Sequence, residues 1–505
     1  MIRKLKSINQ LKVGAALSYL NIIVVNCIGL ILTPFIIRSL GDSEYGLYTL
    51  IGSFVAYLTL MDLGLNNTIV RFVSKYRAEK DREEEKKFLG RIYVIYGAIS
   101  LLVTMIGLIL YFNIETIFSE SLSIDQIKKA KVMYLILVFN IAISLPGGSF
   151  TAICNAYEHF VFPRVINFVR YLVRAITVVA VLKLGGKAIS LVILDTILNI
   201  IGITTLFLYT KRNIKIRVVF SNIRFSTIIP IFNYSIWIFI IAITQSFQWN
   251  AGQLVLGINV NTVTVAVYAV GIMLGTYYGA FAGAINTLLL PKANQMVVQD
   301  KSPNELTLII IKVGRLCNGI SLLILSGFYL FGETFIHLWV GDGYRESWLV
   351  AFLVMLVTTI PLSQSFGHSI LEAQNKIRFK ALANLATIII GVLIGLVLSK
   401  KFGIKGMIYP LTAAMFMNVI ISNLYFRYVF GFKILLFYSK VYFKQTLLLL
   451  FLVISGNYIL NYLSISFTWT NLGITIAIYT IIYSMAFYFF IMNIEEKSLL
   501  RRALS

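Results

Sequence analysis

Four ionisable residues lie deep inside long apolar stretches of the sequence: Asp62, Arg170, Arg174 and Asp195. A charged side chain at the centre of a membrane costs at least about 2.5–3.5 kcal/mol, so it normally faces a partner or a water-filled cavity. Arg170 and Arg174 are four residues apart and therefore share one face of a helix. A guanidinium suits bidentate contact with phosphate. We therefore expect the two arginines to bind phosphate oxygens of a substrate, and Asp62 or Asp195 to titrate with a coupling ion.

A purely structural interpretation of the same charges is equally specific. Arg174 and Asp195 would form an ion pair that ties two neighbouring helices together. Arg170 would extend its side chain to the cytoplasmic headgroups. The sequence leaves both interpretations open.

Two further groups are candidate substrate contacts. Lys312 and Arg315 are three residues apart at the inner end of a predicted helix and would add positive potential where an anionic headgroup enters, although snorkelling alone would also place them there. Gln248, Trp249 and Tyr268 belong to a polar and aromatic region that suits stacking and hydrogen bonding to sugar rings. An interfacial aromatic belt has the same composition.

The composition identifies the setting in which these residues act. Of 505 residues 58% are hydrophobic and 13% are charged, and the mean hydropathy is +0.85. A soluble protein has about 45–50% apolar and about 25% charged residues. The three cysteines have neither paired spacing nor a nearby histidine cluster, so we expect no disulfide framework, no metal and no cofactor. The chain is predicted to be an all-α integral membrane protein.

Windows of about 20 apolar residues predict fourteen membrane spans. They lie at 13–37, 47–70, 91–113, 131–153, 165–183, 188–210, 227–256, 263–290, 308–331, 348–371, 380–398, 406–426, 445–463 and 472–492. With the N-terminus inside, 34 of the 44 basic residues are assigned to the inner side, which places both termini in the cytoplasm. The net charge of +23 is then mostly topological, and nucleic acid is not expected as a partner. The short loops leave no room for an extracytoplasmic catalytic domain, so we expect no enzyme.

Matching landmarks indicate an internal duplication. Gly90-Arg91 matches Gly314-Arg315, and Pro146 matches Pro361, with offsets of 224 and 215. Constant offsets of this kind are typical of duplicated transporter halves. We predict two pseudo-symmetric six-helix lobes, 1–212 and 213–430, and an extra helix pair with a cytoplasmic tail at 431–505. The deep charges do not recur at the matched positions of the second lobe, which are Ala282, Thr387, Gly391 and Thr412.

Three segments carry a family resemblance: FIIRSLGDSEYGLY at 35–48, LMDLGLNNTIVRF at 60–72 and FIHLWVGDGY at 335–344. Together with the two lobes, they resemble the polysaccharide transporter family, the Wzx-type O-antigen flippases of the multidrug, oligosaccharidyl-lipid and polysaccharide exporter superfamily. The resemblance covers roughly residues 10–430. It implies a secondary transporter that flips undecaprenyl pyrophosphate-linked oligosaccharide to the outer leaflet of the bacterial inner membrane for polysaccharide biosynthesis, including lipopolysaccharide.

The resemblance also implies partners and rivals. The partners would be the lipid-linked oligosaccharide, membrane lipids, and glycan polymerase and chain-length enzymes. Within the superfamily, a peptidoglycan lipid precursor flippase and a multidrug or cation extruder are the alternatives. An extruder of cationic drugs is expected to have a net acidic cavity, whereas here two deep arginines match two deep aspartates. A membrane glycan polymerase or ligase is the alternative from a different class, and the short outer loops disfavour it.

Overall fold

The computed structural model describes residues 10–220, 225–298, 302–374, 376–463, 468–494 and 496–498. Within these residues every regular element is helical, and twelve helical segments are long and apolar enough to cross a membrane. The protein is an all-α, multi-pass membrane protein. Both chain ends, predicted to lie in the cytoplasm, fall outside the described residues.

The count of fourteen spans remains a prediction, although two features bear on it. α14 (Arg378–Phe430) covers two predicted spans, and its backbone is non-helical at Gly403, where φ is 53° and ψ is −128°. α9 (Phe225–Asn259) covers the predicted span 227–256 and stands outside the set of twelve. Glycine is the residue that accepts the left-handed φ needed at such a kink.

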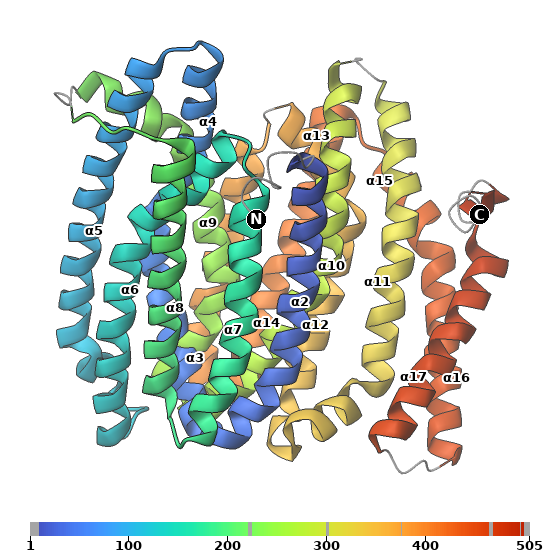
Figure 1. Cartoon of the computed structure of the whole chain (residues 1–505). Coiled ribbons are helices and arrows are strands. Elements are labelled where there is room, and N and C mark those ends of the chain that lie inside the picture. Colours follow the sequence, from blue (N-terminus) through green and yellow to red (C-terminus); the bar gives the residue numbers. More distant parts are fainter. Residues whose placement is uncertain are drawn as a thin grey trace. The chain divides into compact units, whose positions relative to one another are not determined.

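The first compact unit comprises Met1–Ala266 with Leu396–Met407. Its central helix, α6 (Ile124–Ala156), packs between α5 (Arg82–Phe118) and α8 (Ala188–Tyr209) (Figure 1). α7 (Val161–Lys183) packs against α8 and against α2 (Gln10–Leu40). α6, α7 and α8 carry most of the polar residues described below.

The second predicted span, 47–70, is not one continuous helix. It begins as α3 (Asp42–Ala56), tightens into the 3-10 helix η1 (Tyr57–Asp62), and resumes as α4 (Leu65–Ala78). Between them Leu63 and Gly64 both adopt left-handed backbone angles, with φ of 50° and 74°. Irregular backbone at membrane depth is tolerated where it lines a cavity or is buried in protein. The break therefore marks this part of the first unit as a place where a cavity is expected.

The second compact unit comprises Val267–Gly395 with Ile408–Ser505. Most of α10 (Thr262–Val298) belongs to this unit, and α11 (Pro303–Val340) packs against α12 (Glu346–Ser363), α16 (Lys444–Leu463) and α17 (Trp469–Ala486). α13 (Ser365–Ala373) and α15 (Ile434–Tyr438) pack against the N-terminal end of α11. The apolar cluster at this end includes Phe366, Phe426 and Phe437, each fully buried.

The division into compact units differs from the predicted lobes. α9 belongs to the first unit because it packs against α3, η1 and α4. The units are defined by contacts and not by duplication, so the lobes 1–212 and 213–430 and the appendage 431–505 remain a prediction.

Candidate functional site

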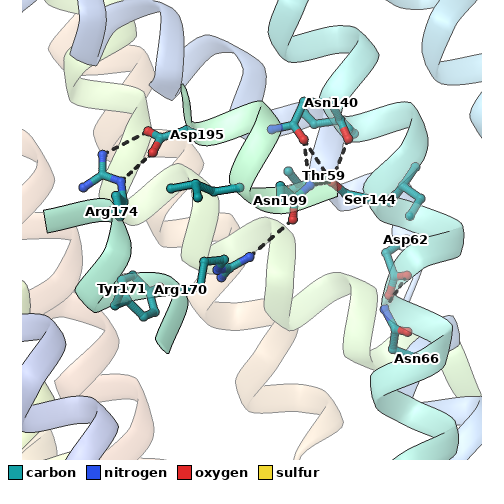
Figure 2. Close-up of a pocket in the computed structure, with 13 residues that line it drawn as sticks. Thr59, Asp62, Asn66, Asn140, Ser144, Arg170, Tyr171, Arg174, Asp195 and Asn199 are labelled. Carbon is teal, nitrogen blue, oxygen red and sulfur yellow. Dashed lines mark hydrogen bonds and ion pairs between the residues drawn. The ribbon is translucent and has the colours of Figure 1, made fainter. Parts of the chain in front are cut away.

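A polar cavity of about 560 Å³ lies within the first unit (Figure 2). Residues from η1, α4, α6, α7 and α8 form its wall. All four deep charges predicted from the sequence line it: Asp62, Arg170, Arg174 and Asp195. The neutral polar residues of the wall are Thr59, Asn66, Asn140, Ser144, Tyr171 and Asn199. The cost of leaving charges in lipid therefore identified residues that share one cavity.

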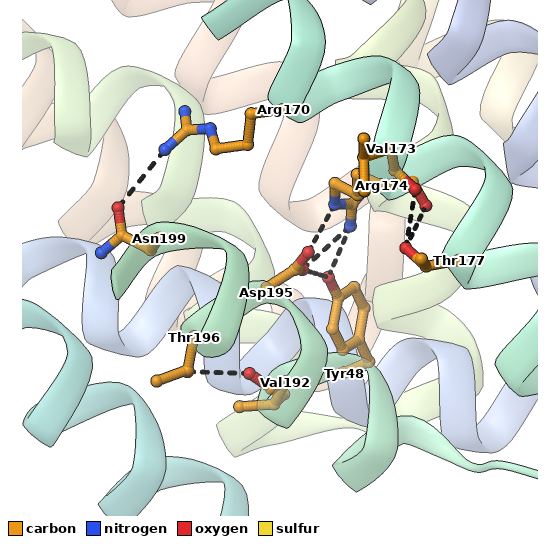
Figure 3. Close-up of polar contacts among 9 residues, drawn as sticks. All are labelled: Tyr48, Arg170, Val173, Arg174, Thr177, Val192, Asp195, Thr196 and Asn199. Carbon is orange, nitrogen blue, oxygen red and sulfur yellow. Dashed lines mark hydrogen bonds and ion pairs between the residues drawn. The ribbon is translucent and has the colours of Figure 1, made fainter. Parts of the chain in front are cut away.

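Arg174 and Asp195 form a two-pronged ion pair. The guanidinium Nε donates to Asp195 Oδ1 at 2.5 Å, and Nη2 donates to Oδ2 at 2.9 Å. The hydroxyl of Tyr48, on α3, donates to Asp195 Oδ2 at 3.2 Å and lies 3.4 Å from Arg174 Nη2 (Figure 3). One polar node thus joins α3, α7 and α8. The ion pair foreseen by the structural interpretation is present, while both side chains still reach the cavity.

Arg170 lies one turn before Arg174 but has a different partner. Its Nη1 donates to Asn199 Oδ1 at 3.3 Å, and its guanidinium carbon lies 5.5 Å from the centre of the Tyr171 ring. Among the described residues it has no ion pair. Because Arg174 is neutralised by Asp195, Arg170 is the cation of this cavity that remains available to an anion.

Asp62 occupies the end of η1, beside the break in the second span. Its Oδ1 accepts hydrogen bonds from Tyr96 Oη at 3.0 Å and from Asn66 Nδ2 at 2.9 Å. Asn66 belongs to the first turn of α4 (Leu65–Ala78), so this carboxylate lies beside the start of that helix, where the helix dipole favours a negative charge. Figure 2 places Asp62 and Asn66 apart from Arg170 along the cavity wall.

Three neutral residues of this cavity were not singled out from the sequence. Asn199 Nδ2 donates to Asn140 Oδ1 at 2.7 Å and to Ser144 Oγ at 2.6 Å. An asparagine within an apolar span is a signal that could have found them, yet such residues also join helices by hydrogen bonds.

The other predicted contacts lie elsewhere. Arg315 donates to Glu496 from Nε at 2.7 Å and from Nη2 at 3.1 Å, and Lys312 is exposed on the same helix, α11. Gln248 and Trp249 lie on α9 and do not line the polar cavity, and Trp249 donates to Gln245 Oε1 at 3.2 Å. Tyr268, on α10, is fully buried. Substrate binding by these five residues remains a prediction.

Comparisons with known proteins agree with the fold and with this setting. The family model described as "Polysaccharide biosynthesis protein" matches residues 11–297, which is more than half of the chain. A comparison with curated protein sequences gives no match.

Solved structures similar to this chain are membrane transporters and a flippase. The lipid II flippase MurJ in an inward closed conformation superimposes with a TM-score of 0.70 at 16% identity, covering 94% of this chain and 98% of that chain. An inward-facing multidrug resistance MATE family transporter gives 0.60 at 12% identity, covering 79% and 94%. A MOP superfamily transporter from Pyrococcus furiosus gives 0.55 at 11% identity, covering 82% and 95%. These similarities establish the fold, and they give no support to the alternative of a glycan polymerase or ligase.

Proposed function

The chain belongs to the family of polysaccharide biosynthesis proteins, and on this premise we propose that it flips a lipid-linked oligosaccharide across a bacterial inner membrane. The carrier lipid in this proposal is undecaprenyl pyrophosphate, and movement runs from the inner to the outer leaflet. The observation that carries the proposal is a polar cavity at membrane depth in which one guanidinium, that of Arg170, has no ion-pair partner among the described residues.

The placement of the charges in the cavity, and not their sum, favours an anionic cargo. Arg174 and Asp195 neutralise each other, and the carboxylate of Asp62 is held by hydrogen-bond donors. Arg170 therefore supplies the positive potential that a bound diphosphate would meet first. A guanidinium can bind phosphate oxygens in a bidentate manner. Amide and hydroxyl groups elsewhere on the wall suit the hydroxyls of a glycan, while the polyprenyl tail stays in lipid.

Transport in this proposal requires the cavity to be exposed to the two sides of the membrane in turn, as in transporters built from repeats. Asp62 and Asp195 are the carboxylates proposed to titrate with a coupling ion, and either could do so. No cofactor takes part. Glycan polymerase and chain-length enzymes would act on the product in the outer leaflet.

The rival functions predict different cavities. A peptidoglycan lipid precursor also has a diphosphate, so the cavity suits that cargo equally, and substrate competition must separate the two. A transporter that extrudes cations would need a carboxylate in the cavity that is available to bind its substrate. Here both carboxylates are engaged and the available charge is positive.

The deciding experiment measures the leaflet distribution of lipid-linked oligosaccharide in cells depleted of this protein. We expect completed intermediates to accumulate facing the cytoplasm while surface polysaccharide is lost. Arg170→Ala at normal protein level should reproduce this defect. Arg345→Ala, whose side chain is 64% exposed, serves as the control and should not. Normal sidedness with new sensitivity to cationic drugs would mean an extruder instead.

A further inference from the structure

A chain of hydrogen bonds connects three helices across the cavity wall and fixes which groups face a ligand. Arg170 on α7 contacts Asn199 on α8, and Asn199 contacts Asn140 and Ser144 on α6 (Figure 2). All four side chains line the cavity. The inference drawn from this chain rests on the proposed function and concerns how the diphosphate would be held.

The donor-only chemistry of arginine sets the direction of the chain. A guanidinium has five N–H donors and no acceptor, so the Asn199 atom 3.3 Å from Arg170 Nη1 must be the oxygen. The amide nitrogen of Asn199 then faces α6 and donates to Asn140 and Ser144 at 2.7 and 2.6 Å. The atom of Asn140 that accepts must likewise be its oxygen. Neither amide can be turned round without setting two donors against each other.

Ser144 is consistent with this direction. Its hydroxyl donates to the backbone carbonyl of Asn140 at 2.6 Å, which leaves its lone pairs to accept from Asn199. Both N–H groups of Asn199 are therefore used, and its oxygen holds Arg170. Asn199 therefore has no N–H donor left for a ligand.

Asn140 and Arg170, in contrast to Asn199, keep unused hydrogen-bond donors. Because the Asn140 oxygen is taken, its Nδ2 group keeps two N–H donors, and no acceptor for them is found among the described residues. This nitrogen is also absent from the buried unpaired atoms of the described chain, as expected for a group that reaches the cavity. Arg170 uses one of its five donors on Asn199. This part of the wall thus presents unused donors.

We propose that Arg170 and Asn140 together bind the diphosphate oxygens of the cargo, and that Asn199 is the positioning residue that presents both. An ionised diphosphate offers acceptors only, whereas each sugar hydroxyl offers a donor as well as acceptors. A wall of donors next to one unpaired cation therefore selects the diphosphate over the glycan. The site assigns the linkage between lipid and sugar to the α6–α7–α8 side of the cavity.

The substitution Asn199→Asp tests the direction of the chain. An aspartate at this position would pair with Arg170 and would accept from α6 where asparagine donates. Asn140 would then turn its N–H groups toward the new carboxylate. Arg170 and Asn140 would both be withdrawn from the cavity, although the substitution replaces only the amide nitrogen of residue 199 by an oxygen.

The experiment measures binding of farnesyl diphosphate to the purified full chain in nanodiscs by calorimetry, with farnesol as the uncharged probe. Asn140→Leu should weaken diphosphate binding by about 10- to 100-fold, the range for one hydrogen bond to a charged partner. Asn199→Asp, which withdraws Arg170 as well as Asn140, should weaken it by at least as much. Ser144→Ala should change it by less than about 3-fold, because the orientation of both amides is kept. Asn113→Leu changes an exposed asparagine whose Nδ2 donates to the carbonyl of Ile109 within its own helix; it is the matched control and should have no effect.

The double variant separates positioning from a general structural role. In the Asn199→Asp background the further change Asn140→Leu should cost nothing, because Asn140 has already turned away. Thermal unfolding of each variant checks that the fold is intact. The proposal would be overturned if Asn140→Leu bound farnesyl diphosphate with wild-type affinity, or if the binding losses of Asn140→Leu and Asn199→Asp were fully additive. Either result would leave the proposed function intact, because the leaflet assay tests that function separately. Failure of the wild-type chain to bind farnesyl diphosphate would remove the diphosphate site itself.

Discussion

The contact between Arg315 and Glu496 gives a quantitative test of how the last two spanning helices are held. Arg315, in the N-terminal half of α11, donates to both oxygens of Glu496, to the backbone carbonyl of Ile491 at 2.7 Å and to that of Lys440 at 3.0 Å. The side chains of Arg315 and Glu496 are 11% and 3% exposed. One guanidinium thus joins α11, the connection before α16, and the segment after α17. The change Glu496→Gln keeps the shape of this contact and removes its negative charge.

The expected cost follows from burial. Removing one partner of a buried ion pair leaves the other charge unpaired and destabilises a protein by about 3–5 kcal/mol. The remaining bonds from Arg315 to backbone carbonyls should keep Glu496→Gln near the lower end of that range. Arg315→Leu should cost at least as much, since it also leaves those carbonyls without their donor. Combining Arg315→Leu with Glu496→Gln should cost less than the sum of the two single changes, because the double variant leaves no isolated charge.

Denaturant unfolding of the purified protein in one detergent provides the measurement, with the three variants forming a double-mutant cycle. The control is Asp342→Asn, which breaks a pair with Arg345 at 3.1 Å whose side chains are 65% and 64% exposed. Exposed pairs contribute about 0–1 kcal/mol, so this variant should stay near the wild type. A loss below about 1 kcal/mol for Glu496→Gln, equal to that of the control, would refute the reasoning.

Three further predictions concern single features of the described chain. Tyr48→Phe removes one donor from Asp195 and should lower stability by about 1 kcal/mol, measured by thermal unfolding; an unchanged midpoint would show that this hydrogen bond contributes nothing. Gly64→Ala places a side chain at a φ of 74° and should cost about 1 kcal/mol, whereas a stabilised variant would contradict the left-handed assignment. Burial, and after it the charge of Lys380, holds the pKa of His368 well below its ordinary value of 6.5. The unfolded chain therefore binds more protons below pH 6.5, stability should fall as pH drops through this range by at most about 1.4 kcal/mol per pH unit, and His368→Gln should flatten that slope.

The sequence could predict that the deep charges lie together in a cavity, because a charged side chain in lipid has a large free-energy cost. Charges avoid lipid at a cost of several kcal/mol, and the four residues that bear this cost share one cavity. The sequence could not rank Arg170 against Arg174, because four-residue spacing places both on one face without saying what stands opposite. That information depends on how α8 is rotated against α7. The ranking came from Asp195 and Asn199, which are themselves four residues apart.

Other features depend on contacts that no local pattern encodes. Arg91 and Arg315 occupy matched positions in the predicted repeat but have different partners. Arg91 binds Glu84, seven residues away on its own helix, at 2.8 Å. Arg315 reaches Glu496, 181 residues away. The break after Asp62 was missed for a related reason, since one glycine in an apolar run is common in spanning helices and gives no firm signal of a helix end.

The pairing of α7 with α8 explains how two arginines one turn apart differ in role. Each arginine meets a residue of α8 at the same spacing, Arg174 meeting Asp195 and Arg170 meeting Asn199. The two α8 residues differ only in a carboxylate oxygen against an amide nitrogen. That single group decides whether the opposing guanidinium is neutralised or merely oriented. A second aspartate would leave the cavity without a free cation, and a second asparagine would leave two arginines unneutralised at membrane depth. One of each keeps a single positive charge available, which is the least costly way to hold an anion at membrane depth and still release it.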